Sequence, residues 1–168
     1  IKNSLFTSGK DFAQVHTLFQ PHRTFIQLQP VIKETEDHFI RPAIGKAFYD
    51  AFKSAARDTD LKKELFDLLR FAVANIAIAK AVESLTAKVT ASGFTVKMAD
   101  DADDPYKTEK QPTDRQLEMK RAAAMETGTR YLAQAKALLN ANASAEIFAA
   151  YFNSSLYVSP VAAAAIDP

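Results

Sequence analysis

A long amphipathic stretch from about Leu61 to Ala87 is the feature that most restricts the fold of this chain. Apolar residues recur in it every three or four positions, which is the period of an α-helix. One stripe contains Leu61, Leu65, Leu68, Ala72, Ile76, Ala79 and Val82, and an adjacent stripe contains Phe66, Leu69, Val73, Ala77 and Lys80. An apolar arc this wide is typical of a central helix that packs on several sides. The pattern therefore predicts a helical bundle built around residues 61–87.

Shorter helical patterns flank this segment. Spacings of three and four predict helices over about 24–40 and 43–56, separated at Arg41-Pro42 because the residue before a proline avoids helical geometry. A second long helix is expected from about 113 to 140, with a short amphipathic helix within 141–158. Only 4 of the 168 residues are glycine, which favours a helix-rich chain.

Three regions depart from this patterning. β-Branched residues alternate around a Ser-Gly turn at about 89–98, which predicts a β-hairpin. The N-terminal region is interpreted as an arm with one short helix, capped by Asp11 and ending near Leu18. Residues 159–168 are Ala-rich and are expected to form an extended or disordered tail. We expect one domain over 1–158, an all-α bundle of four to five helices with one inserted β-hairpin and extended terminal arms.

Composition excludes several classes of protein. Lys and Arg number 21 and Asp and Glu number 20, so the formal net charge of +1 gives no long-range attraction to nucleic acid or acidic membranes. The chain has no cysteine, which excludes disulfides, a thiolate nucleophile and cysteine-based zinc sites. No apolar run of about 18 residues occurs, so no membrane-spanning helix is expected.

No catalytic or metal-binding pattern emerges from the sequence. His16, His22 and His38 lie on separate predicted elements and form no His-x-x-x-His pair. Glu34 and His38 are four apart, one position too far for a di-iron Glu-x-x-His motif, and the carboxylates around them are interpreted as a solvated helix face. The acidic run at 100–104 lacks the Gly and closing Glu of an EF-hand. We expect neither an enzyme nor a bound metal or cofactor.

Six aromatic or β-branched residues fall outside the helical stripes. They are Phe94, Val96, Tyr106, Tyr151, Phe152 and Tyr157. They either pack over the bundle or form contacts with another subunit or partner, since aromatic side chains anchor protein interfaces and a hairpin offers strand edges. The sequence leaves these two interpretations equally open.

One stretch carries a family resemblance. Leu28-x-Pro30-x-Ile32, Glu36 and the motif Phe39-Ile40-x-Pro42-x-Ile44-Gly45-x-x-x-Tyr49 follow one another near the N-terminus. This stretch resembles a family of small prophage proteins from Bacteroides-group hosts. The order of a long apolar helix, a Gly-containing hairpin, a second long helix and an aromatic ending is similar in both.

The layout is similar to that of phage head–tail connector (adaptor) proteins and of the ring proteins in crAss-like phage necks. The resemblance implies a virion protein of the neck, assembled in the bacterial host cytoplasm as a ring of identical subunits, by analogy with portal symmetry twelve. The implied partners are further copies of the chain, the portal protein, and tail or other neck proteins, with passive contact to DNA in the lumen. No catalysis and no membrane contact are implied.

The motif residues Phe39, Pro42, Ile44, Gly45 and Tyr49 also have an architectural interpretation. Pro42 would end one helix, Gly45 would let the next begin close by, and Phe39, Ile44 and Phe48 would meet in a corner of the core. On this view Gly45→Val would destabilise by overpacking, on the order of 1–3 kcal/mol. The alternative function is a small cytoplasmic helical protein-binding module or regulator; a metal-dependent helical enzyme is disfavoured.

Overall fold

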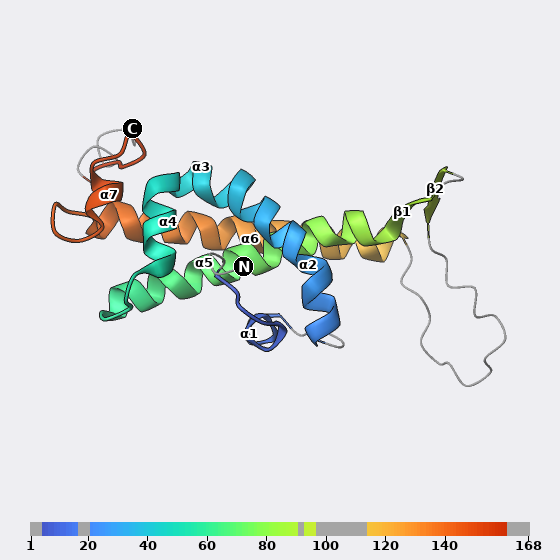
Figure 1. The fold of residues 1–168 in the computed structure, drawn as a ribbon. Coiled ribbons are helices and arrows are strands. Elements are labelled where there is room, and N and C mark those ends of the chain that lie inside the picture. The colour runs from blue at the N-terminus through green and yellow to red at the C-terminus, as the bar shows by residue number, and fades with distance from the viewer. Residues whose placement is uncertain (1–4, 17–20, 91–92, 97–113, 161–168) are drawn as a thin grey trace, which may run out of the picture.

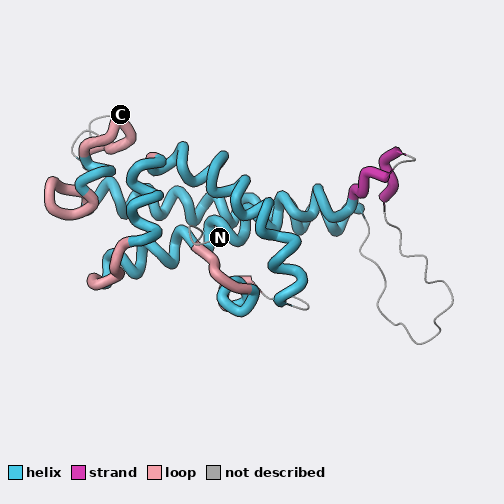
Figure 2. Tube along the Cα trace, viewed as in Figure 1, coloured by secondary structure: helices cyan, strands magenta, loops and turns pink. Residues whose placement is uncertain are grey.

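A computed structural model describes residues 5–16, 21–90, 93–96 and 114–160 (Figure 1). The helices are α1 (Gly9–Ala13), α2 (Pro21–Thr35), the π-helix η1 (Glu36–Ile40), α3 (Arg41–Ile44), α4 (Lys46–Ser54), α5 (Asp60–Thr86), α6 (Asp114–Asn142) and α7 (Ala149–Phe152), and the strands are β1 (Ala87–Thr90) and β2 (Gly93–Val96). Helix dominates the described residues, as Figure 2 shows. The predicted helical bundle is therefore confirmed.

Helices α5 and α6 are the longest elements and lie side by side in opposite directions (Figure 1). Both match the expected spans to within a few residues, and the Thr59 hydroxyl caps α5 by accepting the Lys62 N–H at 3.3 Å. The two helices approach closely at Gly128. A Cβ atom there would lie 2.5 Å from Ile76 Cγ1 and 2.9 Å from Ile76 N, so the contact requires glycine.

The expected break at Arg41-Pro42 is wrong. Helix α2, η1 and α3 follow one another without interruption from Pro21 to Ile44, and Pro30 lies inside α2. In the wider π turn the Arg41 N–H donates to the Glu36 carbonyl, five residues back. This change of hydrogen-bond pattern directly before Pro42 lets a residue without an N–H be accommodated. The helical run ends instead at Gly45, whose φ is +88°.

The N-terminal segment, residues 5–16, packs into the bundle. Ser8 rather than Asp11 caps α1, accepting the Asp11 N–H at 3.1 Å. The side chains of Leu5, Phe6 and Phe12 are fully or almost fully buried. The expected extended arm is therefore wrong for residues 5–16, because three large apolar side chains gain more from burial than from solvent exposure.

The two ends of the molecule differ. At one end α7 closes the bundle with aromatic rings: the Phe48 centroid lies 5.7 Å from both Phe148 and Tyr151. At the other end the antiparallel strands β1 and β2 lie beyond the bundle, with Ala87 opposite Val96 (Figure 1). The strands begin two residues before the expected hairpin, and its last two positions, 97 and 98, lie outside the described residues, as does the tail from 161.

Candidate functional site

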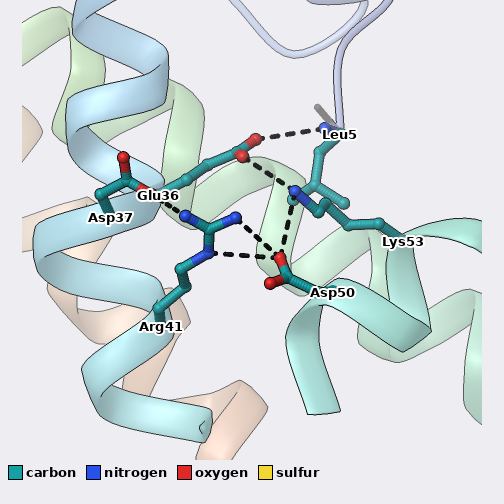
Figure 3. Close-up of polar contacts among 6 residues, drawn as sticks. All are labelled: Leu5, Glu36, Asp37, Arg41, Asp50 and Lys53. Carbon is teal, nitrogen blue, oxygen red and sulfur yellow. Dashed lines mark hydrogen bonds and ion pairs between the residues drawn. The ribbon is translucent and has the colours of Figure 1, made fainter. Parts of the chain in front are cut away.

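Five charged side chains gather where η1 and α3 meet α4. This polar cluster consists of Glu36, Asp37, Arg41, Asp50 and Lys53 (Figure 3). The π turn supplies the first two, α3 supplies the arginine and α4 supplies the last two. Single π turns inside helices occur often at functional sites, so the cluster is a candidate functional site.

The most buried pair in the cluster joins Lys53 to Glu36. Lys53 Nζ lies 3.3 Å from Glu36 Oε2, and the two side chains are 4% and 5% exposed. The other carboxylate oxygen, Oε1, accepts the backbone N–H of Leu5 at 3.2 Å. Glu36 therefore connects the π turn to α4 and to the N-terminal segment at once.

Arg41 forms the second half of the cluster. Its guanidinium donates from Nη2 and Nε to Asp50 Oδ1 at 2.7 and 3.2 Å, and it also pairs with Asp37. Lys53 Nζ lies 3.6 Å from the same Asp50 oxygen, so Asp50 links the two halves. Arg41, Asp37 and Asp50 are a quarter to more than a third exposed, so solvent reaches this half.

The pKa values of two residues follow from this geometry. Burial opposes ionisation of Asp50, but the hydrogen bond and positive charge of Arg41, with help from Lys53, outweigh it and hold the pKa of the carboxyl below its usual value. Burial, together with the nearby Glu36 carboxylate, raises the pKa of the Tyr49 hydroxyl far above its usual range. Tyr49 therefore stays protonated at any physiological pH.

The arrangement joins separate elements of the fold. The Glu36 and Lys53 side chains face each other in the interior of the fold. Within the ranges that the structure describes, no group of three or more histidine or carboxylate side chains is placed to hold a metal ion. The cluster clamps three elements together, because breaking a buried ion pair leaves an uncompensated charge.

The sequence motif residues divide into core and surface. Ile44 and Tyr49 are fully buried, whereas Phe39 is only half-buried and Pro42 is exposed. The expected burial of Phe39 in a corner with Ile44 and Phe48 is therefore wrong, whereas its neighbour Ile40 is 0% exposed. The extra residue of the π turn rotates the helix face and brings Ile40 inward.

Gly45 is required for a different reason than expected. A Cβ atom there would meet only Leu156 Cδ1, at 3.6 Å, which is ordinary contact. Its φ of +88° and ψ of 128°, however, lie in a region that residues with a side chain avoid. Backbone conformation rather than overpacking fixes glycine at this position.

The six residues that were candidates for subunit contacts lie in different environments. Tyr151 is fully buried, and its hydroxyl donates to Asn140 Oδ1 at 2.7 Å, so of the two interpretations left open by the sequence it follows the first and packs in the core. Phe152 and Tyr157 are half-buried and pack together with centroids 4.8 Å apart. Phe94 and Val96 lie on β2, and their contact role stays a prediction. Tyr106 and the acidic run at 100–104 lie outside the described residues.

The sequence did not reveal the ion pairs between residues that lie far apart in the chain. Glu36 was expected on a solvated face but is 4% exposed. Its partner Lys53 is 17 positions away, and Arg70 pairs with Asp11 across 59 positions. Neither spacing produces a periodic signal. Only the Asp37–Arg41 pair, at i and i+4, has a spacing that a helix face predicts.

At the end of the molecule that carries the two strands, a long stretch of α6 is exposed. Residues 115–127 are exposed or half-buried, and Gly128 is the first buried residue from 115 onward. Met119 in this stretch is 63% exposed. The first half of α6 therefore projects from the bundle with the end of α5 and the two strands (Figure 1).

No helix in the described part of the chain combines the length and apolarity that crossing a bilayer requires.

Comparisons with known proteins identify the family of this chain. Neither the curated proteins nor the solved structures contain a match. A family model described as a family of unknown function (DUF6712) matches residues 40–161, from the end of the π turn to beyond α7 and well over half of the chain. The chain therefore belongs to the family of unknown function DUF6712.

Proposed function

We propose that this chain is a structural protein of a phage particle, a head–tail connector of the neck. In this proposal, copies of the chain form a homo-oligomeric ring, twelve by analogy with portal symmetry, between the portal and the tail or further neck proteins. DNA passes through the lumen with only passive contact. The chain performs no catalysis in this role.

The projecting end of α5 and α6 is the observation that carries the proposal. A two-helix rod that extends past its own bundle and ends in two strands is suited to contact a neighbouring subunit. The exposed first half of α6 leaves the rod without an intramolecular cover on that side. The opposite end, in contrast, is closed by the aromatic rings around Phe48.

Two further observations support a structural role. The polar cluster is paired internally and joins the π turn and α3 to α4. The net charge of +1 suits a lumen through which DNA slides without being held, because tight binding requires many positive charges facing phosphates.

Particle composition tests the function. Phage particles induced from the host that carries this gene are purified by density gradient, and their proteins are quantified by mass spectrometry. We expect peptides of this chain in a ratio near one copy per portal subunit. Particles that are complete and infectious but lack the chain would contradict the proposal and favour the regulator or binding module.

Light scattering and negative-stain microscopy test ring formation. The purified chain, alone and with the portal from the same particles, is compared with Phe94→Asp, which places a charge on β2. We expect closed rings for the unmodified chain and a lower mass for the variant with an unchanged melting temperature. The matched control is Ile147→Asp, at the opposite end and 44% exposed, which is expected to assemble normally. Equal assembly of both variants would contradict a contact through β2.

A further inference from the structure

We draw no further inference here: the strongest candidate, the apolar surface on either side of α7 where the Ile147 and Val158 side chains are 44% and 42% exposed, carries nothing because no described part of the structure shows what covers it.

Discussion

Gly128 sets the distance between the two longest helices. The substitution Gly128→Ala would raise helix propensity by about 1 kcal/mol in an isolated helix. Here the new Cβ would lie 2.5 Å from Ile76 Cγ1 and 2.9 Å from Ile76 N, and α5 and α6 would have to move apart. We expect the free energy of unfolding to fall by about 1–3 kcal/mol, measured by urea denaturation. A stabilised variant would show that the helices separate without cost; Thr129→Ala, at the exposed neighbouring position, is the control.

Gly45 makes a prediction that separates strain from overpacking. If its positive φ is what requires glycine, the smallest side chain should already be costly. We expect Gly45→Ala and Gly45→Val to lower the free energy of unfolding by similar amounts, on the order of 1–3 kcal/mol. The additional variant Leu156→Ala removes the atom nearest to the new Cβ and should not rescue Gly45→Ala. A harmless Gly45→Ala beside a damaging Gly45→Val would restore the overpacking explanation.

At the scale of elements, the ion pair between Arg41 and Asp50 fastens α3 to α4 and makes stability depend on pH. The folded-state pKa of Asp50 lies below its unfolded value, so the stabilisation is complete above about pH 4 and is lost as the pH falls through the folded-state pKa. We expect Asp50→Asn to lower the melting temperature at pH 7 and to flatten its decline toward pH 3. The control Glu118→Gln removes an exposed, solvent-screened pair with Arg121 and should change this decline less. If the melting temperatures of Asp50→Asn and of the unmodified chain fell in parallel as the pH is lowered, the pH dependence would not come from Asp50.

The π turn keeps one face of a long helical run directed at the core. Ile32, Glu36, Ile40 and Ile44 are buried at intervals of four, and each such step drifts by about 40° in a regular α-helix. The wider turn reduces that drift. Deleting the exposed His38 should remove the turn, rotate the residues before it relative to Ile40 and Ile44, and lower the melting temperature strongly. The substitution His38→Ala keeps the register and should leave the melting temperature nearly unchanged; equal effects would contradict this role.

The sequence predicted elements whose signal is local and missed those that depend on distant partners. The spans of α5 and α6 follow from apolar residues at helical spacing. The π turn was missed because Pro42 normally signals a break and no periodicity marks an inserted residue. The polar cluster was missed because Lys53 finds Glu36 only after α4 folds back on η1. Burial of the N-terminal segment likewise depends on contacts with α2, η1 and α5, which lie far from it in the sequence.

At the scale of the whole molecule, stability is expected to be uneven along α6. Its second half is covered by α5 and the aromatic end, whereas residues 115–127 contain no buried side chain. We expect amide hydrogens in the first half to exchange at least about tenfold faster than those from Leu132 to Leu139 in the dissociated chain, measured by hydrogen exchange and mass spectrometry. Uniform protection along the helix would show that the projecting half is as stable as the bundle. Slower exchange in this half on ring formation would locate the subunit contact there.

The close approach at Gly128 also has a mechanical consequence. Asp114 lies fourteen residues before this point, about 21 Å along the helix axis at 1.5 Å per residue. With Gly128 as a fulcrum, a tilt of only about 10° would carry the beginning of α6 through about 4 Å. A small change in the packing of Ile76 against Gly128 that tilts α6 therefore produces a displacement several times larger at Asp114. In terms of leverage, the one residue of the contact without a Cβ governs how far the beginning of α6 swings.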